Sequence, residues 1–120
     1  VALRTDWSRN WPDMERMSGL KEDGSENFPG WSLEAIRYIY EVRKAAANGH
    51  ETLDTDGSAE CARHGDLACE RYVLAHNKIQ VEVLCNLDQL PPVGAVLFAS
   101  WPNFRGANGL PCRVFAIAED

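Results

Sequence analysis

A strand-like run that carries a carboxylate is the strongest constraint on this chain. Residues 79–84 read Ile-Gln-Val-Glu-Val-Leu, and the segment ends in a loop at Pro91-Pro92. Because side chains alternate between the two faces of a strand, Gln80 and Glu82 share one face. A carboxylate within an apolar element is costly unless it faces water or binds a cation, a metal ion or a basic side chain. The pattern leaves two interpretations of Glu82 open, a solvated or ordinary ion-paired residue and a metal or catalytic residue.

Strands and helices alternate along the rest of the sequence. Residues 95–99 and 113–118 are continuous apolar runs, which are typical of strands covered on both faces. One helix is expected from Ser32, a good N-cap, to residue 47, where Asn48-Gly49 would stop it. A second helix is expected from Asp66, also as N-cap, to about residue 75. This order predicts an α/β fold, a mixed sheet with flanking helices.

The first thirty residues show less regular structure than the rest of the sequence. Residues 1–4 resemble the interior of a short strand, and residues 13–31 mix charged residues, Gly and Ser as in a long irregular loop. The strand-like start leads us to expect that the polypeptide begins part-way through a larger protein, with a processed or trimmed chain as the alternative.

Charge and cysteine usage narrow the class of protein. The 12 basic and 18 acidic residues give a net charge of −6 with no basic run, which argues against nucleic acid or an anionic membrane surface as a partner. No apolar run approaches the ~20 residues that cross a bilayer. The four cysteines lack zinc-finger spacing, so we expect reduced thiols in the cytoplasm, with two disulfides as the alternative. Cys85 and Cys112 are expected to pack as small hydrophobic residues.

Two further sets of polar residues could take part in a site. His50, Asp54 and Asp56 lie at alternating positions and could bind a divalent ion, but aspartates beside a turn more commonly cap backbone groups, which is the favoured interpretation. Glu70 and Arg71 cannot face the same way on a helix, and a solvated helix face is the favoured interpretation for Glu70.

Five short motifs follow one another in an order that resembles the C-terminal part of the cyclase family of metal-dependent hydrolases, which includes bacterial kynurenine formamidases and isatin hydrolases. The resemblance covers nearly the whole sequence, and the form of the third motif is closer to the isatin hydrolase side of the family. The motifs are Leu-Arg-Thr-Asp-Trp at 3–7, Pro-Gly-Trp-Ser at 29–32, His-Glu-Thr-Leu-Asp-Thr-Asp at 50–56, Glu82 with Asn-Leu-Asp-Gln-Leu-Pro at 86–91, and Pro-Cys-Arg-Val at 111–114.

The resemblance implies a swivelling β/β/α fold in which residues 1–120 are the C-terminal part of one hydrolase domain. It also implies hydrolysis of an amide or lactam C–N bond by water activated on Mn²⁺ or Zn²⁺. The family's main metal motif, His-x-Gly-Thr-His-x-Asp, does not occur in these residues. The resemblance therefore implies a partner, the N-terminal half of the same protein on another chain, and a homo-oligomer acting on a small cyclic amide or formamide.

Site residues are carried over by position. Glu82 matches the family's late acidic residue at the metal, and Gln80 shares its face and would bind metal or substrate. Glu70 stands where the formamidases have a His pair, so a single metal ion fits better. Four aromatic residues would form a wall for a planar substrate or simply cover the core: Trp7, Trp11, Phe28 and Trp31. The rival hypothesis is a non-catalytic binding or assembly domain with a degenerate site.

Overall fold

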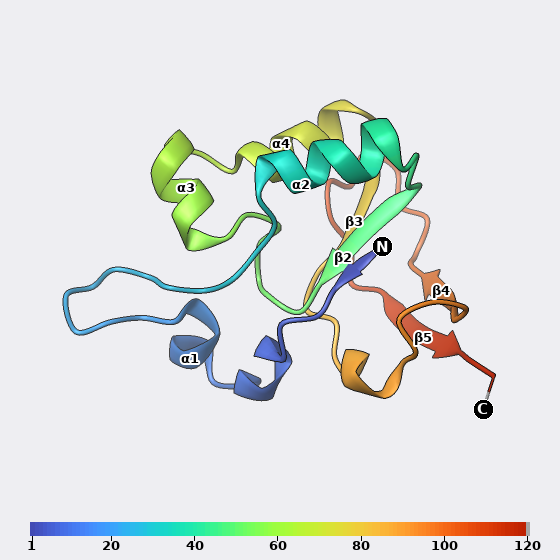
Figure 1. The fold of residues 1–120 in the computed structure, drawn as a ribbon, viewed down its shortest axis with the longest axis horizontal. Helices are drawn as coiled ribbons and strands as arrows, with labels where there is room; N and C mark the ends of the chain where they lie inside the picture. The colour runs from blue at the N-terminus through green and yellow to red at the C-terminus, as the bar shows by residue number, and fades with distance from the viewer. Residues whose placement is uncertain (120) are drawn as a thin grey trace. The chain divides into compact units, whose positions relative to one another are not determined.

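The structure is a computed structural model that describes residues 1–119, and the chain divides into two units, Val1–Leu87 and Asp88–Asp120. Figure 1 shows the elements in order. They are β1 (Ala2–Leu3), a 3₁₀ turn (Trp7–Asn10), α1 (Met14–Ser18), α2 (Leu33–Arg37), a π-helical turn (Tyr38–Val42), β2 (Ala47–His50), α3 (Ser58–His64), α4 (Ala68–Ala75), β3 (Ile79–Val81), a 3₁₀ turn (Leu87–Gln89), β4 (Val96–Ser100) and β5 (Arg113–Ile117). The predicted α/β class is confirmed.

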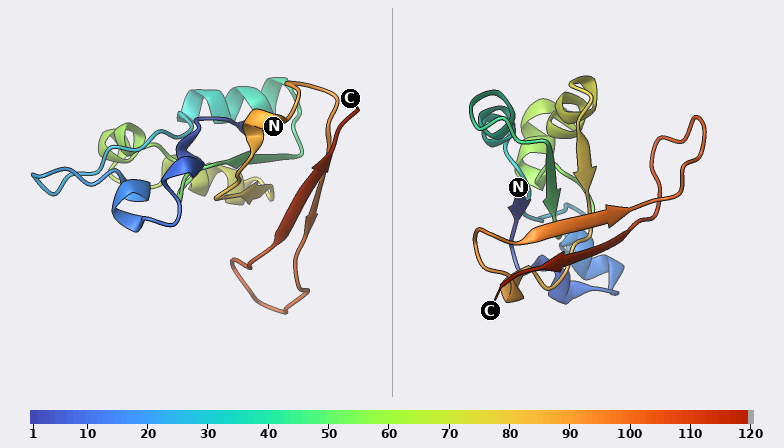
Figure 2. Two further views of the ribbon diagram at one scale, coloured as in Figure 1. Left: turned by 90° about the horizontal axis from the view of Figure 1, so that it is seen from below. Right: turned by 90° about the vertical axis from the view of Figure 1, so that its right-hand side faces the viewer.

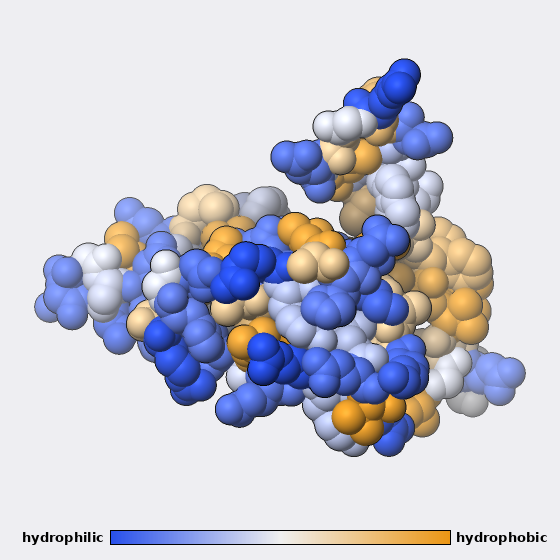
Figure 3. Space-filling model, turned by 90° about the horizontal axis from the view of Figure 1, so that it is seen from above, coloured by the Kyte–Doolittle hydropathy of each residue, from blue (hydrophilic) through white to orange (hydrophobic). Residues whose placement is uncertain are grey.

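The first unit is built on a parallel sheet in the order β1-β2-β3. The chain passes through helices between one strand and the next. Helices α2 and α4 lie side by side along the sheet (Figures 1 and 2). The core between them consists of apolar side chains from both helices and their flanks, namely Trp31, Ile36, Ile39, Tyr40, Cys69 and Val73. Seen from above, the surface is mainly hydrophilic with scattered apolar residues (Figure 3).

The prediction for the first helix is right at its start and wrong at its end. Helical structure continues past α2 as the π-helical turn and stops at Val42, after which Lys44 adopts a left-handed conformation with φ 56°. Asn48 and Gly49 then lie in the central strand β2, paired with Gln80 and Val81 of β3. A Cβ on Gly49 would come within 2.7 Å of Leu84, so the glycine serves close packing rather than a helix stop.

Three other local expectations need correction. The predicted loop 13–31 contains α1, which Asp13 caps by accepting a hydrogen bond from the Arg16 amide. Helix α3 was not predicted. Helix α4 does not begin at an Asp66 cap, because the Asp66 carboxylate instead pairs with Arg71 at 2.6 Å.

Ser32 does act as the N-cap of α2, since its Oγ accepts a hydrogen bond from the Ala35 amide at 3.2 Å. Replacing Ser32 with alanine is expected to lower the free energy of unfolding by about 1 kcal/mol, because one amide of the first turn loses its partner. Urea unfolding followed by circular dichroism measures this. Ser18→Ala is the matched control, since its hydroxyl only donates back to the Glu15 carbonyl within α1, and an equal loss in both variants would contradict the cap.

The second unit contains an antiparallel hairpin of β4 and β5, so both predicted strands are confirmed. Its register aligns Val96 with Ile117 and Phe98 with Phe115, whose rings stack at 4.9 Å. These four side chains share one face and are 45–58 % exposed. The expectation that both strands are covered on both faces is therefore wrong for the described residues, because a two-stranded hairpin offers no second layer to bury them. Cys85 and Cys112 are likewise exposed rather than packed.

Candidate active site

The candidate site lies where β2 and β3 end. The carboxyl ends of neighbouring parallel strands meet at one edge of a sheet, and ligands of open α/β sheets bind outside that edge. Strand β2 ends at His50, and Glu82 directly follows β3. The register that pairs Asn48 with Gln80 brings His50 beside Glu82 on the same face. The chain thus places an imidazole, an amide and a carboxylate together.

His50 is fully buried, and neither of its ring nitrogens has a hydrogen-bond partner among the described residues. Its Nε2 lies 3.9 Å from Oε1 of Glu82. Burial lowers the pKa of His50 to about 4, against a smaller opposing effect of the Asp56 charge. The imidazole is therefore neutral at ordinary pH, with a nitrogen lone pair available for a ligand.

Glu82 is the partly exposed member of the group, with 37 % of its side chain accessible. Its Oε1 accepts a hydrogen bond from Gln80 Nε2 at 3.3 Å, and Gln80 Oε1 accepts one from the Thr55 hydroxyl at 2.8 Å. Burial, followed by the charges of Glu70 and Asp54, raises the pKa of Glu82 to about 7. Among the described residues no lysine or arginine pairs with Glu82.

The neighbouring carboxylates strengthen the negative potential. Burial raises the pKa of Asp54, helped by Asp56 and Glu26. Burial also raises the pKa of Glu70, helped by Asp54 and Asp56. Glu70 is therefore half-buried within reach of the cluster, and the interpretation of a purely solvated helix face is wrong for it. Such a group of carboxylates favours binding of a proton or a cation.

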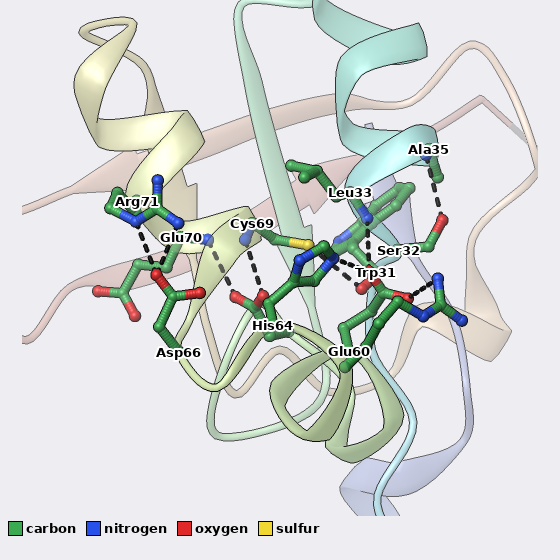
Figure 4. A network of polar contacts seen from close by, with 12 residues as sticks. Trp31, Ser32, Leu33, Ala35, Glu60, His64, Asp66, Cys69, Glu70 and Arg71 are labelled. Carbon is green, nitrogen blue, oxygen red and sulfur yellow. Dashed lines mark hydrogen bonds and ion pairs between the residues drawn. The ribbon is translucent and has the colours of Figure 1, made fainter.

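Asp56 has a structural task. It is fully buried, and its two oxygens accept hydrogen bonds from the amides of Cys69 at 2.7 Å and Glu70 at 3.0 Å, so it caps α4 from a distant loop. This confirms the capping interpretation for Asp56. The amides of Cys69 and Glu70 donate to this carboxylate, while Arg71 turns to Asp66, as Figure 4 shows.

A second buried carboxylate belongs to Glu60 (Figure 4). Glu60 on α3 accepts a hydrogen bond from the Leu33 amide at 3.2 Å and pairs with Arg63 at 2.8 Å and His64 at 3.3 Å. These contacts fasten α3 to the start of α2. His64 is thereby a satisfied histidine, as is His76, whose Nδ1 lies 2.8 Å from the Tyr72 carbonyl oxygen.

The four predicted substrate-binding aromatics occupy different environments. Trp7 is half-buried and its indole donates to the Met17 carbonyl at 2.8 Å, whereas Trp11 is 57 % exposed. Phe28 is half-buried, and Trp31 belongs to the core. Their role as an aromatic wall stays a prediction.

Glu51 was missed by the sequence reasoning. It is buried at the end of β2, where Oε2 accepts from the Thr5 amide and hydroxyl and Oε1 accepts from Ser8. These bonds hold the segment that carries Trp7 against the strand that carries His50. Alternation alone could have separated Glu51 from His50, because neighbours in a strand point to opposite faces.

The predicted metal site has no complete set of ligands among the residues that the structure describes. Within residues 1–119 no group of three or more His, Cys, Asp or Glu side chains is arranged to hold a metal ion. The role of Glu82 and Gln80 as metal ligands stays a prediction. No helix in the described part of the chain has the length and apolarity needed to cross a membrane.

The pKa of Glu82 leads to a prediction about stability and pH. A carboxyl whose pKa rises from 4.5 when unfolded to about 7 when folded keeps its proton longer in the folded state. The free energy of unfolding therefore falls as the pH rises through that interval, and Glu82→Gln removes this fall. We expect the variant to gain stability over the wild type between about pH 4 and about pH 8 in thermal unfolding with a chelator present. Parallel pH profiles of the two proteins would contradict it.

Comparisons with known proteins agree with this architecture. Residues 1–57 match the family described as "Putative cyclase". The isatin hydrolase of Roseibium aggregatum is 27 % identical over 117 residues, which cover 98 % of this chain and 44 % of that protein. Isatin hydrolase A from Ralstonia solanacearum has a TM-score of 0.89 at 34 % identity, covering 99 % of this chain and 45 % of that one. Isatin hydrolase A from Labrenzia aggregata, bound to benzyl benzoate, has a TM-score of 0.89 at 32 % identity, covering 100 % and 46 %.

The chain thus spans about half the length of these relatives, and the match lies in their C-terminal part. The parallel sheet, the flanking helices and the hairpin together form a partial α/β domain. These findings support a cyclase-family, isatin-hydrolase-like polypeptide that corresponds to the C-terminal part of those proteins.

Proposed function

We propose that this chain forms the C-terminal part of a metal-dependent hydrolase that cleaves the C–N bond of an amide or lactam. The observation that carries the proposal is the pairing of Glu82 with Gln80 at the carboxyl edge of the parallel sheet, beside the unpartnered imidazole of His50. The similarity to isatin hydrolases supports hydrolysis as the reaction class. Residues 1–120 then belong to one hydrolase domain together with the half that this chain does not match.

The donor set fits a divalent ion. The carboxylate of Glu82 is a ligand that Mn²⁺ and Zn²⁺ accept. The amide oxygen of Gln80 accepts from Thr55 in the structure and has a second lone pair for such an ion. The nearby Asp54 and Glu70 add negative charge. When bound, the ion supplies a Lewis acid for the carbonyl and lowers the pKa of water.

The residues of this chain add proton transfer and orientation. The oxygen of Glu82 that does not contact the ion would accept a proton from attacking water and return it to the departing nitrogen. Gln80 orients the Glu82 carboxylate by donating to Oε1, and Thr55 fixes Gln80 in turn. We assign the contacts to a planar substrate, a small cyclic amide or formamide, to Trp7, Trp11, Phe28 and Trp31.

The remaining metal ligands would come from the N-terminal half of an isatin-hydrolase-like protein. We propose that this half is on another chain, that the assembly is a homo-oligomer of such pairs and that it works in the cytoplasm. Support comes from the relatives, of which this chain covers 44–46 %, and from the exposed face of the β4–β5 hairpin, formed by Val96, Phe98, Phe115 and Ile117. Apolar patches of this kind usually mark an interface.

The test starts with the protein as isolated from its cells, together with any accompanying polypeptide. Elemental analysis and intact-mass measurement are expected to find about one Mn or Zn per complex and a second polypeptide. Hydrolysis of isatin and of formamides is then assayed for the wild type and for Glu82→Gln. We expect the variant to lose at least about a hundredfold in kcat, the size of effect typical of a lost acid–base group.

The matched control is Glu41→Gln, an exposed carboxylate that accepts from Tyr72 on the outer side of the helices. It should leave kcat unchanged. A lone, metal-free species without hydrolytic activity would overturn the proposal in favour of a non-catalytic assembly domain. That second candidate is favoured only by the exposed hairpin face, which a binding partner would cover as well.

A further inference from the structure

Buried side-chain polar atoms without a hydrogen-bond partner occur among the described residues in Trp31, Asn48 and His50, and His50 is the one of these that lies next to Glu82. Both ring nitrogens are buried and lack a hydrogen-bond partner among the described residues. Leaving a buried donor or acceptor unsatisfied costs about 1–3 kcal/mol, and native structures keep few such groups. His64 and His76 differ in this respect, because each has a partner.

The position of His50 is as informative as its burial. Its Nε2 lies 3.9 Å from Glu82 Oε1, which is too long for a hydrogen bond. Two ligand atoms that each bind one ion at about 2.1 Å can lie up to roughly 4.2 Å apart. A single ion can therefore contact both atoms at an angle wider than tetrahedral, and a small movement of the partly exposed Glu82 side chain would bring the angle closer to tetrahedral.

The electrostatics around this pair favour a cation as the missing partner. Carboxylates approach from three elements, with Glu82 after β3, Glu70 on α4 and Asp54 on the loop between β2 and α3. The Asp56 carboxylate is occupied by the α4 amides. Neutral imidazole together with carboxylate oxygen suits Zn²⁺ or Mn²⁺.

We propose that His50 Nε2 is a direct ligand of the same divalent ion that Glu82 and Gln80 bind. This inference rests on the proposed function and adds a residue to it: the strand β2 contributes a nitrogen ligand, so this chain supplies its ligands from two adjacent strands. Rigid strands fix the distance between ligand atoms better than a loop, and the ion would link the ends of β2 and β3.

The test uses the complete protein with this chain labelled with ¹⁵N-histidine and any companion chain unlabelled. The labelled chain has only three histidines, so its ring nitrogens can be assigned individually. The metal is removed with a chelator, and Zn²⁺ alone is added back. We expect the Nε2 signal of His50 to shift on binding while the signals of His64 and His76 stay in place.

The variant His50→Gln is expected to weaken Zn²⁺ binding at least tenfold, and His76→Gln to leave it unchanged. Because His50 is fully buried, circular dichroism is used to check that the variant folds. If the variant does not fold, the shift of the His50 signal in the wild type tests the proposal by itself. If Glu82→Gln weakens Zn²⁺ binding but Zn²⁺ does not shift the His50 ring signals of the wild type, the role of His50 is overturned. The proposed function would then still stand. Absence of Zn²⁺ binding in the wild type would overturn both.

Discussion

Replacing Gly30 with alanine is expected to destabilise the first unit by about 3 kcal/mol or more, the upper range for inserting a group into a packed interior. A Cβ at this position would lie 2.2 Å from the Gly57 nitrogen and 2.5 Å from the Asp56 carbonyl carbon. Both contacts are with backbone, so no side-chain rotation relieves them. They occur where Trp31 bridges to Asp56 and where the Trp31 amide donates to the Thr55 carbonyl at 2.9 Å.

Thermal unfolding measured by circular dichroism tests this expectation. The control is Gly109→Ala, because a Cβ at Gly109 meets nothing within 4 Å. With a total stability of only about 5–15 kcal/mol for a typical domain, the Gly30 variant should melt far below the wild type or fail to fold. Similar melting temperatures for the two variants would show that the strand bridge relaxes easily.

Replacing Asp56 with alanine should have the second-largest effect, a loss of about 3 kcal/mol. The substitution removes two hydrogen bonds from buried amides to a charged acceptor, each worth about 1.5–3 kcal/mol, with partial compensation from relaxation. It also removes the cap of α4 and so loosens the helix turn that carries Glu70. Urea unfolding gives the free energy directly.

Asp66→Ala is the matched control for Asp56, since Asp66 also contacts α4 but through an exposed pair with Arg71. Exposed ion pairs contribute about 0–1 kcal/mol, so this variant should stay close to the wild type. Asp56→Asn keeps one acceptor and should fall between the two. An Asp66 effect as large as that of Asp56 would assign the cap to the residue nearer in sequence.

The comparison of these two aspartates shows what the sequence could and could not predict. Ser32 was recognisable as a cap because its acceptor and the Ala35 amide are three residues apart. Asp56 caps α4 across 13 residues, and nothing local distinguishes it from Asp66. Likewise the local sequence predicts a helix stop at Gly49, because the contact with Leu84, 35 positions further along the chain, is a tertiary one.

In the candidate site, too, local patterns predict some contacts and tertiary packing sets the others. Alternation along 79–84 was enough to group Gln80 with Glu82, and the structure shows them hydrogen-bonded. The approach of His50 to Glu82 depends on the register between β2 and β3, which no local pattern specifies. Glu70 reaches the cluster through the packing of α4 on the sheet, again a tertiary effect.

The π-helical turn at Tyr38–Val42 has a consequence for chain length. Such a turn holds one residue more than the α-helical turn it replaces, here closed by the Arg43 amide on the Tyr38 carbonyl at 3.1 Å. Removing one residue would restore an α-helical turn and change which side chain occupies each position of the turn. The Tyr40 hydroxyl, which donates to Asn48 at 2.6 Å, would then lose this hydrogen bond. A homologue that is one residue shorter in this helix must therefore present a different side chain to the strand that bears the imidazole.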